Sequence, residues 1–199
     1  ASEELQYGDF KFTIEDNEVT ITEYTGSSAS VVVPERINGY IVTSLASQAF
    51  AYCASLETIT LPPNLKELGY TVFQGTGIQS ITIPKTVTEC MTYGGGPFSG
   101  ANSLKKVIFE DGMETIPDYC LYKSTVSEVV IPDTVTRIGG YTFDECENIE
   151  AITLPPGITE LGGGSFSGCT SLKEIDIPKG VKEIQYSTFS GCSMLSRVG

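Results

Sequence analysis

Short segments of alternating apolar side chains recur along this chain, and most of them end at proline. Six segments have two aliphatic residues that flank one other residue and are followed by Pro, and a seventh segment ends in Glu in place of Pro. The closing residues are Pro34, Pro62, Pro84, Glu110, Pro132, Pro155 and Pro178. They lie 22 to 28 residues apart. A period of this length predicts a solenoid, in which each coil buries its apolar residues against its neighbours.

The spacing within one segment predicts a short strand. Ile175 and Ile177 are two residues apart and therefore share one face, whereas Asp176 points outward. Pro178 ends the strand because proline cannot donate a ladder hydrogen bond. Equivalent strands of successive coils would pair in parallel about 4.8 Å apart. We therefore expect a parallel β-sheet along one face of the solenoid.

The remainder of each unit also repeats. Its form is Pro-x-x-Val-x-x-Ile-x-x-x-x-Phe-x-x-Cys-x-x-Leu-x-x-Ile-x-Ile. The stretch Ser165–Cys169 suits a single helical or 3₁₀ turn, and the runs Gly139–Gly140 and Gly162–Gly164 suit tight bends. The recurrent aromatic residues should stack in one buried ladder, formed by Phe143, Phe166 and Phe189.

This repeat resembles the BspA-like class of bacterial leucine-rich repeats, found on surface proteins of host-associated bacteria and some protists. The clearest marks are Leu172-x-x-Ile175-x-Ile177-Pro178 and Phe166-Ser167-Gly168-Cys169. The resemblance implies a right-handed leucine-rich-repeat solenoid of about seven coils, with a parallel β-sheet on one face and short helical or 3₁₀ turns and loops on the other.

The amino-terminal region differs from the repeat. Two alternating segments, Phe10–Ile14 and Val19–Gly26, flank the polar run Glu15–Glu18 and predict a β-hairpin. A hairpin there would cover the exposed end of the first coil. The predicted organisation is a capping hairpin over residues 1–30 and a solenoid over 31–199. The last repeat is incomplete, which suggests a longer natural protein.

Charge and composition narrow the classes of function. Lys and Arg total 12 against 25 Asp and Glu, which gives a formal net charge of −13. This balance disfavours nucleic acid and anionic membrane surfaces. No apolar run is long enough to predict insertion into a membrane. Histidine is absent, so the chain cannot build a Ser-His-Asp triad or a His-ligated zinc site. No catalytic residue, metal site or cofactor is predicted, and the chain is not expected to be an enzyme.

The cysteines indicate packing. Cys53, Cys146, Cys169 and Cys192 share one repeat position, three residues after a Phe, and Cys90 falls at a recurrent Ile position. We interpret all five as buried core residues. On neighbouring coils their Cβ vectors would be nearly parallel, which disfavours disulfides. C-x-x-C pairs, typical of thiolate zinc sites, do not occur.

Two insertions interrupt the regular spacing. The first surrounds Arg36–Tyr40, and the second spans Met91–Pro97. Insertions in solenoids emerge as loops and often carry binding sites. Tyr40 and Tyr93 are therefore candidate contact residues. The alternative, which the sequence favours, is that these loops reflect neutral drift, because repeats tolerate such loops at little entropic cost.

The outward face of the strand ladder is the remaining candidate site. Its central positions are mostly threonine or acidic, but Ile108 and Val130 are adjacent and apolar. Exposed apolar patches mark contact surfaces, although β-propensity alone also favours such residues. The predicted partner-binding residues are Ile108, Val130, Tyr93 and Tyr40.

These observations favour a non-catalytic, extracellular binding or adhesion module, secreted or held at the cell surface. Its expected partner is a host extracellular-matrix protein or a bacterial surface protein. A glycan is the other ligand class that the sequence leaves open. The alternative is a structural spacer that displays another domain of a larger surface protein.

Overall fold

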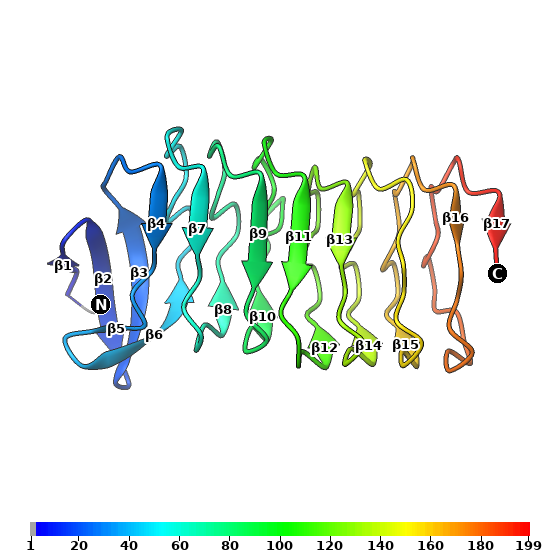
Figure 1. Ribbon diagram of the computed structural model, residues 1–199, viewed down its shortest axis with the longest axis horizontal. Helices are drawn as coiled ribbons and strands as arrows, with labels where there is room; N and C mark the ends of the chain where they lie inside the picture. Colours follow the sequence, from blue (N-terminus) through cyan, green and yellow to red (C-terminus); the bar gives the residue numbers. More distant parts are fainter. Residues whose placement is uncertain (1–2) are drawn as a thin grey trace.

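The computed structural model describes residues 3–199 and shows a solenoid whose coils stack along one axis, with the two termini at opposite ends (Figure 1). Eight successive rungs form the first ladder. Seven of them contain strands: β4 (Ser30–Val32), β7 (Thr58–Thr60), β9 (Ser80–Ile83), β11 (Lys106–Phe109), β13 (Glu128–Val130), β16 (Glu174–Ile175) and β17 (Arg197–Val198). The rung between β13 and β16 contributes an isolated parallel bridge from Ala151 to Glu174. The expected parallel ladder is confirmed, and β17 supplies its eighth rung.

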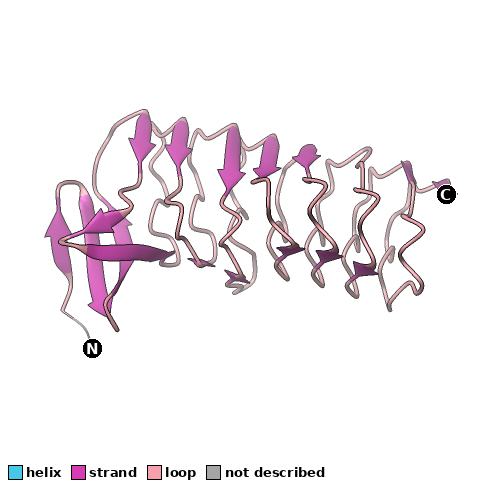
Figure 2. Ribbon diagram, turned by 60° about the horizontal axis from the view of Figure 1, so that its bottom comes forward, coloured by secondary structure: helices cyan, strands magenta, loops and turns pink. Residues whose placement is uncertain are grey.

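A second parallel ladder runs along another face of the solenoid (Figure 2). It forms where the Val-x-x-Ile part of each unit lies. Its strands are β6 (Tyr40–Leu45), β8 (Glu67–Leu68), β10 (Glu89–Cys90), β12 (Thr115–Ile116), β14 (Arg137–Ile138) and β15 (Glu160–Leu161). Pairing joins β6 to β8 and β10, and separately joins β12 to β14 and β15. The sequence pattern indicated buried apolar residues here but not a second ladder.

The expected helical or 3₁₀ turns are wrong, since residues 3–199 contain no helix. Two left-handed residues flank the Phe position of most coils and prevent helical continuation. In one coil they are Tyr141 at φ 53° and Glu145 at φ 56°. Their N–H groups bond to carbonyls of the next coil, at 3.0 Å to Gly163 and 2.8 Å to Ser167. Backbone pairing between coils therefore accompanies isolated i→i+3 turn bonds on this face, such as Cys146 N–H to the Phe143 carbonyl at 3.0 Å, in place of a helix.

The core is a column of stacked side chains, as the repeat predicts. Phe143 and Phe166 are fully buried with ring centroids 5.0 Å apart, and Phe189 stacks on Phe166 at 5.8 Å. Phe189 is only partly buried, because it lies in the last coil. A second stack continues through the earlier coils, and Leu121 occupies the position between the two stacks. The earlier stack contains Tyr24, Phe50, Phe73 and Phe98.

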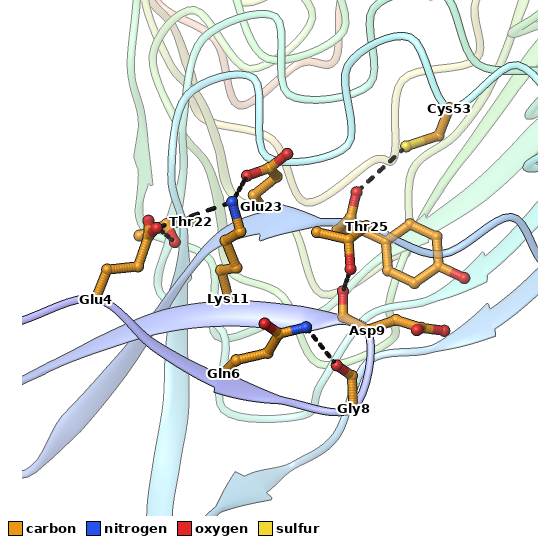
Figure 3. A network of polar contacts seen from close by, with 10 residues as sticks. Glu4, Gln6, Gly8, Asp9, Lys11, Thr22, Glu23, Thr25 and Cys53 are labelled. Carbon is orange, nitrogen blue, oxygen red and sulfur yellow. Dashed lines mark hydrogen bonds and ion pairs between the residues drawn. The ribbon is translucent and has the colours of Figure 1, made fainter.

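The predicted hairpin is confirmed within the described residues; residues 1–2 of the predicted cap lie outside them. Strands β2 (Phe10–Glu15) and β3 (Glu18–Tyr24) pair antiparallel, and β1 (Leu5–Tyr7) adds a third strand. The turn residues Asp16 and Asn17 have φ of 50° and 64°, as a two-residue hairpin turn requires. Lys11 bonds Glu23 across the sheet, and the Cys53 thiol of the first coil reaches the Tyr24 carbonyl at 3.8 Å (Figure 3).

The first insertion has a structural role that the sequence left open. Residues Arg36–Ile37 form β5, which folds antiparallel on β6 through Asn38 and Gly39, both at positive φ. The insertion thereby extends β6 to six residues. Because β3 pairs in parallel with β6, the longer strand is the platform that joins the cap to the second ladder.

Candidate functional site

The outward face of the first ladder presents the predicted apolar pair. Ile108 and Val130 lie directly opposite each other in the pairing of β11 with β13. Val130 is 40% exposed and Ile108 is half-buried. Next to them, Lys106 and Glu128 form an ion pair at 2.6 Å across the same two strands. The pair is thus an apolar spot near the middle of the first ladder, with charged residues at its margin.

A hollow adjoins this pair where the first ladder is interrupted. Among the described residues, no strand pairing joins β13 to the rung at Ala151. The resulting hollow has a volume of about 390 Å³, and Glu128 and Val129 form part of its wall. On the opposite wall, Arg197 pairs with Glu174 at 3.1 Å and with Asp176 at 2.7 Å. The walls of the hollow are largely polar, which suits contact with a polar segment of a partner.

The other two predicted site residues lie elsewhere. Tyr93 follows β10 of the second ladder, where its ring packs 5.6 Å from Tyr70 and its side chain is 80% exposed. Tyr40 begins β6 and is 37% exposed. The structure therefore brings Ile108 and Val130 together, and it places Tyr40 in β6 of the second ladder and Tyr93 in the bend after β10.

A row of tyrosines on the turn after the second ladder was missed by the sequence reasoning. Tyr119 and Tyr141 stack at 5.2 Å with an interplanar angle of 7°. Tyr122 meets Tyr119 edge-on at 5.8 Å, and Tyr186 lies 6.5 Å from Tyr141. We call these four residues the tyrosine edge. A sequence signal existed, because Tyr119 and Tyr141 both lie two residues before the core Phe or Leu of their coils.

Two glycines make room for the Tyr186 and Tyr141 rings of this edge. A Cβ on Gly163 would lie 2.5 Å from the nearest atom of the Tyr186 ring, and one on Gly164 would lie closer still to the Tyr141 ring. Gly164 also has a φ of 64°, whereas the other two glycines of this run do not require positive φ. The bend interpretation therefore holds for Gly164, and close packing explains Gly163.

All six cysteines are free thiols. Cys146 and Cys169 are fully buried, and their Sγ atoms lie 3.0 and 3.1 Å from the carbonyls of Leu121 and Phe143 in the preceding coils. Burial, followed by the neighbouring Cys169, raises the pKa of Cys146, and burial likewise raises the pKa of Cys169. Such thiols are poor nucleophiles, so they act as packing residues that also satisfy carbonyl groups.

Three cysteines depart from the expected full burial. Cys53, Cys90 and Cys192 are half-buried. Cys192 lies in the last coil, where no further coil covers it. Cys90 lies where the second ladder is interrupted between β10 and β12, and its pKa is raised first by a hydrogen bond with Cys120 and then by burial. Interruptions of the stack, rather than repeat position, decide these exposures.

We expect Cys146 and Cys169 to make stability fall at alkaline pH. In the unfolded chain these thiols ionise near pH 9.0, whereas in the folded chain they keep their protons to higher pH. Above about pH 9 the unfolded state therefore binds fewer protons, and the free energy of unfolding decreases. Urea unfolding between pH 7 and pH 10.5 measures the slope.

The control for this slope is the double variant Cys146→Ala, Cys169→Ala. Alanine occurs naturally at the same repeat position as Ala101, so the fold accommodates it. The variant should show a shallower alkaline loss of stability than the wild type. Equal slopes would contradict the assignment, as would rapid alkylation of both native thiols.

The repeat geometry matches a known family. The sequence model of the BspA type Leucine rich repeat region matches residues 23–114 and 90–196, with six copies. The chain belongs to the BspA-type leucine-rich repeat family. The matched region includes the end of β3 and nearly the whole solenoid, which agrees with the repeat read from the sequence. No curated protein matches this BspA-type chain.

Solved structures of bacterial leucine-rich repeat proteins resemble it. One from Bacteroides ovatus is 27% identical with a TM-score of 0.72, covering 98% of this chain and 52% of its own. The BspA-type chain thus spans about half the length of that relative. The T. pallidum Leucine Rich Repeat protein is 24% identical with a TM-score of 0.56, covering 99% of this chain and 82% of its own. The latter likeness concerns the fold alone.

Neither the matched family model nor these similar structures point to a family of enzymes. The BspA-type solenoid is a repeat scaffold on which side chains are presented at regular intervals. Within residues 3–199, no helix is long and apolar enough to cross a membrane. Over the same residues, no group of three or more His, Cys, Asp or Glu side chains is arranged to hold a metal ion.

Proposed function

We propose that this BspA-type chain is an extracellular binding or adhesion module that engages a partner through the outward face of its first ladder. The observation that carries the proposal is the apolar pair of half-buried Ile108 and exposed Val130, directly opposite each other at mid-solenoid. Apolar groups near the centre of a contact surface, surrounded by polar groups, are where binding energy concentrates. The family, typical of bacterial surface proteins, supports a secreted or surface location.

The frame around the pair favours binding without reorganisation. Strands β9, β11 and β13 form one continuous parallel sheet, with Thr82, Ile108 and Val130 in register. Because the backbone is already ordered by coil-to-coil hydrogen bonds, a partner would order few main-chain groups on binding. The proposed partner is a protein of the host extracellular matrix or of a bacterial surface.

The experiment measures binding of the purified chain to a panel of immobilised extracellular-matrix proteins and bacterial surface proteins. Replacing Ile108→Asp and Val130→Asp together should weaken saturable binding at least about tenfold. Two apolar side chains that the partner would cover become carboxylates, which lose their hydration on binding. The circular dichroism spectrum should not change, because both side chains face outward.

The matched control is Val32→Asp. Val32 occupies the equivalent outward position on β4 and is 69% exposed, so the substitution adds one negative charge to the same face, away from the site. Binding should survive it. If the double variant binds as tightly as the wild type, the first-ladder face is not the site. If the chain binds no protein of the panel saturably, the alternative function, a structural spacer, is favoured. The elongated stack of coils also suits that function.

A further inference from the structure

Cys90 and Cys120 differ from the other four cysteines in their hydrogen-bond partners. The Sγ atoms of Cys146, Cys169 and Cys192 each donate to a backbone carbonyl of the preceding coil, and that of Cys53 donates to a carbonyl of the cap. Cys90 and Cys120 instead hydrogen-bond to each other. Two thiols in contact have a reaction that a single buried thiol lacks, the formation of a disulfide.

The geometry of the repeat brings these two side chains together independently. Cys120 occupies the position that Thr142 has one coil later. The Thr142 hydroxyl reaches back to the preceding coil and donates to the Pro117 carbonyl at 3.0 Å, next to Ile116 of β12. Cys90 of β10 is the residue equivalent to Ile116. A side chain at the Cys120 position therefore lies against the Cys90 position of the coil before it.

The objection to disulfides between equivalent cysteines does not apply to this pair. Cysteines at one repeat position of adjacent coils have nearly parallel Cβ vectors, which is a poor geometry for closure. Cys90 and Cys120 hold different repeat positions, one in a strand of the second ladder and the other directly before the core residue Leu121. Their side chains approach from two directions and meet at the sulfur atoms.

A hollow gives small molecules access to one of the two sulfurs. Among the described residues, no strand pairing joins β10 to β12. The hollow at this interruption has a volume of about 250 Å³, and Cys90 forms part of its wall. Cys90 is half-buried, whereas Cys120 is fully buried. An external reagent therefore reaches Cys90 first, and Cys120 is in place for a second step.

The walls of the hollow indicate the class of reagent. Glu89 and Asp118 line it together with Arg137, which lies 3.7 Å from Asp118 and is near only one of the two carboxylates. Both carboxylates also raise the pKa of Cys90, although the hydrogen bond with Cys120 and burial contribute more. Negative charge at this site disfavours an anionic reagent such as glutathione disulfide. A small, uncharged disulfide suits the hollow better.

We propose that Cys90 and Cys120 form a dithiol site that a small, uncharged disulfide converts into an intramolecular disulfide. Cys90 gives its proton to water, and its thiolate attacks one sulfur of the reagent, whose S–S bond breaks as the first thiolate leaves. Cys120 gives its proton to that thiolate and attacks the Cys90 sulfur, which expels the second thiolate, and this takes a proton from water. Two protein thiols are thereby oxidised, and one reagent disulfide is reduced to two thiols.

The new bond would join two coils where strand pairing is missing. It would close the segment from residue 90 to residue 120, and such a cross-link stabilises a protein by restricting its unfolded chain. Disulfides form and persist in oxidising surroundings outside the cell. The dithiol site does not depend on the binding function proposed above, because its chemistry needs no partner protein.

The test treats the full, reduced chain with hydroxyethyl disulfide at about pH 8.5, where thiolates form, and then alkylates it in denaturant. Four of the six thiols should remain alkylatable. Lys105 and Lys106 lie between the two cysteines, so digestion after lysine identifies the linked peptides by mass. The oxidised chain should melt at least about 5 °C above the reduced chain, and a reductant should reverse this shift.

Cys120→Ala is the decisive variant, and Cys146→Ala is its matched control. Alanine already occupies the same repeat positions as Ala49 and Ala101, so both variants should fold. Cys120→Ala should stop at a mixed disulfide, with half of the reagent held on Cys90, and should gain no thermal stability. Cys146→Ala should form the intramolecular bond as the wild type does.

Six alkylatable thiols in the treated wild type would overturn the proposal. A link between any other pair of cysteines, or between two chains, would also overturn it. Faster linkage in urea than in the native chain, or a lower melting temperature after oxidation, would show that the fold does not accommodate the bond. Faster reaction with glutathione disulfide would contradict the assigned class of reagent. Since these measurements involve no binding partner, this proposal and the proposed function can fail separately.

Discussion

Replacing Phe166→Ala is expected to lower the free energy of unfolding by about 3 to 5 kcal/mol. Phe166 is fully buried and stacks between Phe143 at 5.0 Å and Phe189 at 5.8 Å. Truncation would remove contacts with both neighbouring coils and leave a cavity. The coils cannot move together to close it, because their backbones are already joined by hydrogen bonds. Because solenoid coils depend on their neighbours, the loss should extend to the adjacent repeats.

Chemical denaturation followed by circular dichroism measures this loss, and hydrogen exchange shows how far along the stack it extends. Tyr93→Ala is the control, since it deletes an aromatic ring that is 80% exposed. It should change stability by no more than about 0.5 kcal/mol. If Phe166→Ala melted within about a degree of the wild type, the buried stack would not be the main support of the C-terminal coils.

The second large effect is expected from Gly162→Ala. A Cβ on Gly162 would lie 2.6 Å from the Gly139 carbonyl carbon and closer still to the Gly140 nitrogen of the preceding coil. Backbone atoms of a hydrogen-bonded ladder cannot move aside as a side chain would. We expect destabilisation of about 3 kcal/mol, the upper part of the usual range for overpacking.

Gly157→Ala is the matched control for this substitution in the same repeat. Its Cβ would have ordinary contacts, 3.5 Å from the Asp133 carbonyl oxygen and 3.8 Å from that of Val135. Its backbone does not have positive φ. The control should be neutral or slightly stabilising, because alanine reduces the entropy of the unfolded chain. Similar stability of the two variants would contradict the close-packing explanation for Gly162.

The sequence by itself determined the repeat and the parts that follow from its period. Ile175 and Ile177, two residues apart before a proline, predicted a strand with Asp176 outward and parallel pairing between equivalent residues of successive coils. The parallel pairing and the exposure of Asp176 are confirmed, although the strand β16 itself spans only Glu174–Ile175. The stacking of Phe143 on Phe166 followed from identical positions in adjacent coils. The hairpin around Asp16 and Asn17 followed from local alternation and turn chemistry.

Only the tertiary structure decided features that depend on how one coil meets the next. The Phe turns are not helical because residues such as Tyr141 adopt positive φ and bond to the following coil, a choice made by partners 22 residues away. The half-burial of Cys90 reflects a local interruption of the second ladder. Ile108 lies in the first ladder, whereas Tyr93 lies in the bend that follows β10 of the second ladder. Linear spacing could not show this separation, because the path of a coil around the core sets which side chains share a surface.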